Sequence, residues 1–394
     1  MKQLYLLHGQ HKSVAMKRTC ILISFLFSFF ACSHNVSKNT LDSFMPGELW
    51  PDNEGNHINA HGGGMIRVND RYYWFGEFKI SGPDGNKAMV GVSCYSSPDL
   101  YNWRNEGIAL HVADNDTNSP ITTGCVLERP KVIYNKKNNR YVMWFHLELK
   151  NKGYSAAMTG VAVSKKVTGP YAFIRALRPN AGIWPVNYPD SLKKVQLDNS
   201  GIRDWSPEWM ELIKKGLYLK RDFESGQMSR DMTLFVDENG RAYHIHASED
   251  NLTLHISELT DDYLDFSGRY YRIFPGGHNE APAMFRHNNK YFLITSGCTG
   301  WEPNAARLAM ADSITGNWQY FDNPCTGADS ALTYHGQGTF VLPLDGNRFI
   351  FMADRWAPEN PVDGRYLWLP IRFSKEGIPY LEWLDEWDVE EWEE

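Results

Sequence analysis

Five polar side chains stand immediately before short apolar segments of similar pattern. They are His61, Glu128, Asp231, Glu280 and Gln337, in the sequences AHGGGMIRV, ERPKVIY, RDMTLFV, EAPAMFR and QGTFVLP. If these segments are equivalent strands of a circular repeat, side chains at this repeated position converge on its axis. Converging carboxyl groups indicate acid/base cleavage of a glycosidic bond.

The three carboxyl groups of this set suit the chemistry of glycoside hydrolysis. Across a funnel, two of them can stand the roughly 6.5–9.5 Å apart that an inverting hydrolase needs to admit a water molecule. A third acid nearby raises the pKa of the proton donor by repulsion between like charges. The residues alone therefore predict a site that contains Glu280, Asp231 and Glu128.

The elements that must position these residues repeat five times. Each unit has a short apolar strand, a polar turn, a strand rich in aromatic and β-branched residues, and a further strand that leads to an aromatic edge. The turns NDR, NKKNNR, DENG, HNNK and LDGN fall at the same place in every unit, as hairpins require. We predict an all-β, five-bladed β-propeller, with a β-sandwich as the alternative.

An insert interrupts the regular spacing of the units. The sequence distance from Glu128 to Asp231 is about twice the distance between later members of the set, and the excess lies at about 175–228. Its Trp and Tyr residues argue against disorder, and residues 205–216 (WSPEWMELIKKG) fit a short amphipathic helix. We expect the insert to fold over one face of the propeller and to line a pocket.

The N-terminal residues are typical of an export signal. Lys17 and Arg18 precede an apolar segment at 20–30, which is long enough for a signal sequence but short for a membrane span. Met16 is the expected start, and the sequence FFAC resembles a bacterial lipobox in which Cys32 is lipidated. An ordinary cleaved signal is the alternative.

These features predict the organisation and location of the protein. We expect a signal region at 1–31, a tether at 32–45 and a single catalytic domain at 46–394. The tether SHNVSKNT has no acidic cluster that would resemble a surface-export signal. We therefore expect a monomeric, exported bacterial lipoprotein at the periplasmic face or outer membrane.

The net charge of −7 does not indicate a polyanion partner. Residues 382–394 contain eight acidic and no basic residues, so the rest of the chain carries a net charge of +1. We expect no nucleic-acid partner, and contact with a membrane only through the lipid anchor. The spacing of Cys94, Cys125, Cys298 and Cys325 fits no metal site, and whether they form disulfide bridges stays open.

Six stretches of the chain, in this order, resemble glycoside hydrolase family 43. They are AHGGGMIRVNDRYYWFGE, CVLERPKVIYN, SRDMTLF, NEAPAMF, TGWEPN and YHGQGTF. The similarity covers about residues 50–385, and within the family it is closest to the exo-β-1,3-galactanase branch. The resemblance implies an inverting exo-glycosidase that needs no cofactor.

The resemblance also implies catalytic roles. Glu280 matches the general acid, and Asp231 matches the residue that orients this acid and tunes its pKa. The aspartate base that family members carry in the first blade is missing, because His61 and three glycines occupy its place. The galactanase branch shares this departure, and Gln337 matches the glutamine assigned as its base. A neutral amide is a poor base, so Glu128 is the alternative if geometry allows it.

Further residues are candidates for contact with the substrate. Glu77 matches a position that binds sugar hydroxyls, and Trp301 offers an apolar platform for a galactose face. Three residues at second-strand ends, Glu249, Asp354 and Arg355, are weaker candidates. His61 lies near the axis, where many relatives hold a calcium ion or water. The histidines at 244 and 246 resemble a metal pair but lack a third ligand, so a structural role is favoured.

We expect hydrolysis of terminal galactose from β-1,3-galactan, such as an arabinogalactan backbone, and therefore an oligo- or polysaccharide partner. An α-L-arabinofuranosidase or β-galactofuranosidase of the same family is the first alternative. A glycan-binding lipoprotein that has lost catalysis is the second. A plain ion pair between Arg129 and Glu128 is the structural alternative to a role for Glu128 in catalysis.

Overall fold

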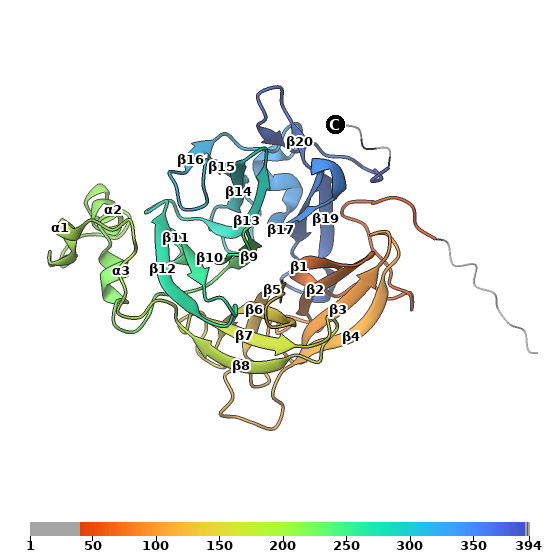
Figure 1. The fold of residues 1–394 in the computed structure, drawn as a ribbon, viewed down its shortest axis with the longest axis horizontal. Coiled ribbons are helices and arrows are strands. Elements are labelled where there is room, and N and C mark those ends of the chain that lie inside the picture. Colours follow the sequence, from red (N-terminus) through yellow and green to blue (C-terminus); the bar gives the residue numbers. More distant parts are fainter. Residues whose placement is uncertain (1–39, 391, 393–394) are drawn as a thin grey trace, which may run out of the picture. The chain divides into compact units, whose positions relative to one another are not determined.

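The computed structural model describes residues 40–390 and 392. In this part of the chain, five antiparallel sheets stand around a central axis (Figure 1). Their first strands each contact the first strands of both neighbouring sheets, which closes a ring. These strands are β1 (His61–Val68), β5 (Val126–Asn135), β9 (Met232–Val236), β13 (Glu280–His287) and β17 (Gln337–Pro343). The prediction of a five-bladed propeller is confirmed.

Each blade continues outward from its first strand in sequence order. Blades one and two add β2 (Arg71–Phe78), β3 (Gly91–Ser97), β4 (Arg104–His111), β6 (Arg140–Glu148), β7 (Met158–Ser164) and β8 (Ala172–Leu177). Blades three and four add β10 (Ala242–Ser248), β11 (Thr253–Leu259), β12 (Phe266–Ile273), β14 (Lys290–Ser296), β15 (Arg307–Ala311) and β16 (Gln319–Phe321). Blade five adds β18 (Phe349–Arg355) and β19 (Arg365–Pro370), and the hairpin β20 (Arg372–Phe373) and β21 (Pro379–Tyr380) follows it.

The turns between the first and second strands have the chemistry that the sequence predicts. Each contains Asn or Gly in the left-handed conformation, which these residues adopt more readily than other residues do. The residues are Asn69, Asn139, Gly240, Asn288, Asn289, Gly346 and Asn347. The same local signal thus ends the first strand of every blade.

Aromatic side chains fill the junction between blades one and five. Trp368 packs edge-on against Trp50 and Trp74, with ring centroids 4.9 and 4.7 Å apart. Beside them, the backbones of Phe44 and Trp387 exchange two hydrogen bonds of 2.7 and 3.1 Å. Much of the high aromatic content therefore stabilises the contact between the first and last blades.

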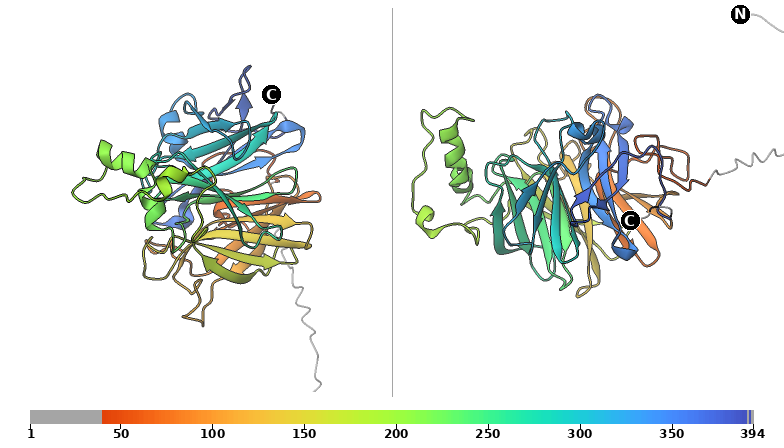
Figure 2. Two further views of the ribbon diagram at one scale, coloured as in Figure 1. Left: turned by 60° about the vertical axis from the view of Figure 1, so that its left-hand side comes forward. Right: turned by 90° about the horizontal axis from the view of Figure 1, so that it is seen from above.

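The insert contains three short helices, α1 (Asp190–Lys193), α2 (Pro207–Lys214) and α3 (Leu217–Arg221). The Ser206 side chain caps the N-terminus of α2, as the predicted helix requires. The expectation that the insert folds over one face needs correction. It packs against β12 at the outer edge of blade three, where Tyr188 and Leu219 contact Tyr270, and it projects sideways (Figure 2). The reason is that β12 offers the apolar side chains of the insert a surface on which they become buried, whereas the open face of the funnel does not.

Blade three also has a polar interior. His244 and His246 from β10 and His255 from β11 are fully buried, and successive rings lie 5.0 and 5.4 Å apart. Burial lowers the pKa of His244 to about 3 and lowers the pKa of the other two below its usual range. The three rings are therefore neutral at pH 7, and protonation opposes the folded state.

Several expectations concern residues outside those that the structure describes. The signal region, Cys32 and most of the tether lie outside the described residues. Among the described residues, no helix is long and apolar enough to cross a membrane. The four cysteines considered for bridges, Cys94, Cys125, Cys298 and Cys325, are free thiols.

The histidines of blade three generate a prediction about acid sensitivity. Their folded pKa values are lower than the value of 6.5 in the unfolded chain, so their contribution to stability is complete above pH 6.5 and is lost as the pH falls. His244→Gln should reduce the slope of unfolding free energy between pH 6.5 and 4.5 by about 1.4 kcal/mol per pH unit. Urea unfolding at several pH values measures this slope. The exposed His335→Gln is the control, and an unchanged slope in His244→Gln would contradict the prediction.

Candidate active site

A pocket of about 270 Å³ opens where the first strands begin. It brings together six of the residues predicted from the sequence. They are Glu77, Glu128, Asp231, Glu280, Trp301 and Gln337. Blades two to five contribute through the repeated position, as expected around an axis, whereas blade one contributes Glu77 near the end of β2.

A β-bulge recurs at the start of the first strands. The pairing register shifts between His61 and Gly64, between Glu128 and Lys131, and between Glu280 and Ala283. In each bulge, the residue after the polar side chain has a left-handed backbone: Gly62 (φ 58°), Arg129 (φ 55°) and Ala281 (φ 50°). A bulge re-aims the neighbouring side chain, so it sets where each polar residue points.

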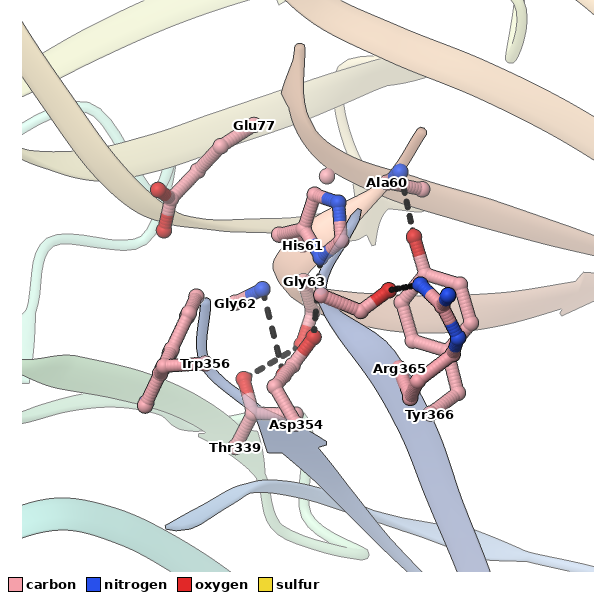
Figure 3. A network of polar contacts seen from close by, with 12 residues as sticks. Ala60, His61, Gly62, Gly63, Glu77, Thr339, Asp354, Trp356, Arg365 and Tyr366 are labelled. Atoms are coloured by element: carbon pink, nitrogen blue, oxygen red, sulfur yellow. Dashed lines mark hydrogen bonds and ion pairs between the residues drawn. The ribbon is translucent and has the colours of Figure 1, made fainter. Parts of the chain in front are cut away.

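Each left-handed residue donates its backbone N–H to a carboxylate of the preceding blade. Gly62 donates to Asp354 Oδ2 (3.2 Å), Arg129 to Glu77 Oε1 (2.9 Å) and Ala281 to Asp231 Oδ2 (3.2 Å). We call these three contacts the inter-blade bulge bonds; Figure 3 shows the first of them. A left-handed backbone costs about 1–2 kcal/mol in a residue other than glycine, and a hydrogen bond to a charged acceptor offsets this cost.

The three glycines of AHGGG are required by close approach of neighbouring atoms. A Cβ on Gly62 would lie 2.1 Å from Glu77 Oε1, and a Cβ on Gly63 would lie 1.9 Å from the Phe75 carbonyl oxygen. A Cβ on Gly64 would lie 2.3 Å from Lys131 Cδ. The glycines therefore allow Glu77 and Lys131 to reach the axis.

Glu280 has the environment of a proton donor. Burial, together with the charge of Asp231, raises its pKa to about 7. Asn251 Nδ2 donates to its Oε1 (2.5 Å), and the Cys298 thiol also bonds to it. Glu280 therefore keeps a substantial protonated fraction near pH 7, as a general acid requires.

Asp231 is placed to act on Glu280. Its Oδ2 accepts hydrogen bonds from Ala281 N and from Arg129 Nη2 (2.8 Å). The bond to Ala281 joins the aspartate to the residue after Glu280, so it fixes the positions of the Asp231 and Glu280 carboxyl groups relative to each other. Arg129 pairs with Asp231 rather than with Glu128, which corrects the ion-pair alternative drawn from the sequence.

The orientation of the Gln337 amide follows from its neighbours. One end faces Arg129 Nη2 (2.5 Å) and Trp356 Nε1 (2.9 Å), which can only donate, so this end is the carbonyl oxygen. The amide nitrogen donates to Ser296 Oγ (3.0 Å). Both lone pairs of the oxygen are thus engaged, and accepting a proton from water requires one of these donors to move.

Glu128 is bound on all sides. Its Oε1 accepts from Asn86 (2.9 Å) and Tyr154 (2.7 Å), and its Oε2 lies 2.9 Å from His146 Nδ1. His146 also contacts Glu148 through Nε2 (3.0 Å), and the two carboxylates raise its pKa to about 9. The resulting imidazolium and the hydrogen bonds hold the pKa of Glu128 far below its usual range. Such a carboxylate suits the binding of sugar hydroxyls better than the acceptance of a proton.

Two tryptophans form the apolar part of the pocket. The rings of Trp301 and Trp356 lie 5.7 Å apart and nearly perpendicular, and Trp301 is 42% exposed. The Arg129 guanidinium lies 5.2 Å from the Trp356 ring centroid. Glu77 closes the pocket on the first-blade side, where it pairs with Lys79.

The other predicted contacts lie outside this pocket. His61 is buried against Tyr366, with Nδ1 3.6 Å from Asp354 Oδ1, and Asp354 binds Gly62 (Figure 3). Glu249 is fully buried within blade three, in an ion pair with Arg272.

Arg355 lies outside this pocket but lines a neighbouring one, together with Trp301, Gln337 and Trp356. It donates to the Tyr334 carbonyl oxygen (2.9 Å) and lies over the Trp383 ring. Sugar contact by Arg355 stays a prediction, whereas sugar contact by His61, Asp354 and Glu249 is corrected, because these side chains serve packing and backbone bonds within and between blades.

Sequence reasoning missed seven residues of the pocket. They are Arg129, His146, Tyr154, Arg230, Asn251, Gly300 and Trp356. Most lie next to or close to a residue that was predicted, for example Arg129 beside Glu128, Arg230 beside Asp231 and Trp356 beside Arg355. That adjacency is the only signal in the sequence. Tyr154 lies in a loop with no motif at all.

The residues present do not fit an axial calcium ion. Lys131 reaches across the axis, and its Nζ donates to the Gly62 carbonyl oxygen (2.9 Å) and approaches Thr339 Oγ1 (3.4 Å). The Lys131 ammonium group thus binds the Gly62 carbonyl oxygen, which a cation on the axis would need as a ligand. Glu128, His146 and Asp231 have ligand atoms within 4.8 Å of one another, but both nitrogens of His146 face carboxylates.

A propeller whose funnel holds a carboxyl group of raised pKa beside a second carboxyl group has the site of a glycoside hydrolase. The sequence profile of glycosyl hydrolases family 43 matches residues 203–379. A solved family 43 β-1,3-galactosidase with galactodeoxynojirimycin is 52% identical, with 88% of this chain and 100% of that one covered and a TM-score of 0.86. The chain belongs to glycoside hydrolase family 43.

More distant solved relatives are named exo-β-1,3-galactanases. The enzyme of Phanerochaete chrysosporium, with β-1,3-galactotriose, is 33% identical, with 89% of this chain and 68% of that chain covered and a TM-score of 0.71. The enzyme of Clostridium thermocellum is 34% identical, with 87% and 66% covered and a TM-score of 0.69. No curated protein matches the sequence.

The contact between Asp231 and the Glu280 segment predicts the pH profile. Because Glu280 must be protonated to act, kcat/KM should fall as the pH rises through about 7. Asp231→Asn removes the like charge that helps to raise the pKa of Glu280, so this fall should move to lower pH. Rates across pH 5–9 measure the shift. Asp237→Asn, just beyond the other end of β9, is the control, and an unmoved profile in Asp231→Asn would contradict the tuning role.

The amide of Gln337 generates a second prediction. If it directs the attacking water, Gln337→Ala should lower kcat on the order of 10²-fold with a smaller change in KM. Gln337→Glu retains an oxygen acceptor for Arg129 and Trp356 and should keep more activity than Gln337→Ala. Steady-state kinetics on one substrate compares the variants. If Gln337→Ala is fully active, Gln337 does not direct the attacking water and Glu128 becomes the candidate for this role.

Proposed function

We propose that the enzyme releases galactose from the non-reducing end of β-1,3-galactan with inversion. The observation that carries the proposal is the make-up of the pocket. Blade one contributes Glu77 to it but no aspartate, because the segment AHGGG stands where that aspartate is expected, and blade five contributes Gln337. The names of the similar solved structures, a β-1,3-galactosidase and exo-β-1,3-galactanases, support the same substrate.

The size of the pocket supports removal of single sugars. About 270 Å³ is below the range of roughly 300–1,000 Å³ typical of pockets for drug-sized ligands. A pocket of this size suits one sugar ring better than an internal stretch of a polysaccharide. The size therefore supports exo-acting cleavage.

The proposed reaction proceeds in one displacement. Glu280 gives its proton to the glycosidic oxygen as the bond from that oxygen to C1 breaks, and water attacks C1 from the opposite face. The Gln337 amide orients the attacking water, the proton that this water loses is released to solvent, and Glu280 takes a proton from solvent after the products leave. Asp231 keeps Glu280 protonated beforehand, while Glu77, Glu128 and Trp301 bind the sugar. One water molecule is consumed, and the free sugar has the inverted configuration.

We also propose that the enzyme is an exported, monomeric lipoprotein attached through Cys32 at the periplasmic face or outer membrane. The charged and apolar residues before Cys32 and the sequence FFAC support this proposal. Metabolic labelling with a fatty acid analogue, compared with Cys32→Ser, tests the anchor.

Defined β-1,3-galacto-oligosaccharides test the proposed activity. Wild-type enzyme should release only galactose, and NMR at early times should show the inverted anomer. Glu280→Gln should lower kcat about 10²–10⁴-fold while calorimetry shows binding retained, because the amide cannot donate the proton. Glu376→Gln, on the exposed β20–β21 hairpin, is the control.

Two outcomes would contradict the proposed activity. Arabinose release from an aryl arabinofuranoside without galactose release would favour the arabinofuranosidase alternative. Binding without turnover in the wild type would favour a glycan-binding protein. The raised pKa of Glu280 argues against the second alternative, since a binding protein has no need of a proton donor.

A further inference from the structure

Trp205, in the insert, is exposed in a way that packing does not explain. It is 57% exposed and has a left-handed backbone (φ 65°), which is unfavourable for a bulky residue. Its ring lies 4.9 Å from the ring of His278 and 5.3 Å from that of Trp209. These neighbours support one edge of the indole and leave much of it open to solvent.

The position of Trp205 places it on the same side as the general acid. His278 precedes Glu280 by two residues, a separation of at most about 7 Å along an extended chain. Glu280 donates its proton to the leaving group, so the departing part of the substrate must leave the pocket on this side. A leaving-group chain that extends from Glu280 toward His278 would therefore pass beside Trp205.

The insert is fixed firmly against this side of the site. Leu252, next to Asn251, packs in the cluster of Trp209, Ile213 and Leu217. Arg272 pairs with Glu249 and donates to the Ile213 and Lys214 carbonyl oxygens (2.5 and 2.7 Å), which caps the C-terminus of α2. The segment that bonds Glu280 and the helix that follows Trp205 are thus parts of one packed unit.

We propose that Trp205 is a binding platform for a distal sugar of the leaving-group part of the galactan chain. The proposal rests on the function proposed above and extends it to substrate length. An indole face offers a galactose ring a large apolar contact at low conformational cost, and its partial exposure leaves that face open to the substrate. The insert thereby gives the enzyme a preference for long chains, while the pocket itself binds a single sugar.

The test compares substrates of different length. In Trp205→Ala, kcat/KM on a β-1,3-galacto-hexasaccharide should fall about tenfold, chiefly through KM, because contacts of an aromatic ring are worth roughly this much. Cleavage of the disaccharide and of an aryl β-galactoside should stay within about twofold. Trp205→Phe should restore part of the loss. Val195→Ala, another exposed apolar position of the insert, should behave as wild type.

The outcomes separate this proposal from the proposed function. If wild type cleaves the oligosaccharides and Trp205→Ala shows the same dependence on length, the platform is refuted and the proposed function stands. An equal loss on all substrates would also refute it, because Trp205 would then act on Glu280 through His278. If wild type cleaves no β-1,3-galacto-oligosaccharide, the proposed function fails and the platform fails with it.

Discussion

The geometry of the site depends on the three inter-blade bulge bonds. Each places a left-handed residue beside a polar side chain and donates its N–H to a carboxylate of the preceding blade. The left-handed backbone is strained at Arg129 and Ala281 though not at Gly62, and in all three bonds the largely buried carboxylate needs a donor. Together they position Glu77, Asp231 and Asp354 and direct Glu128 and Glu280 toward the axis.

Arg129 connects these parts electrostatically. Its backbone donates to Glu77, and its side chain donates to Asp231, Gln337 and the Gly338 carbonyl oxygen. One buried guanidinium thus neutralises part of the charge of the acids around it. Glu280 does not share in these hydrogen bonds, and its burial together with the charge of Asp231 raises its pKa to about 7.

The sequence predicts the ring and the acids because both follow from local repetition. Turn residues and strand patterns recur in each blade, and Glu280 and Asp231 stand at the repeated position. Arg129 could not be paired in advance, since its partners lie 102 and 208 residues away and meet it only in the closed ring. The positions of His61, Glu249 and Asp354 were predicted wrongly, because a strand end gives no sign of which side chain a bulge or turn redirects, and a shift of one residue reverses the face.

The bond from Gly62 to Asp354 has a consequence for biosynthesis. These residues are 292 positions apart, so the first blade cannot complete its side of the pocket until the last blade has been synthesised and has docked. Contacts of such separation form slowly because the intervening chain must first be ordered. A nascent chain with four finished blades would still lack a working site, so the enzyme gains activity only when the ring closes.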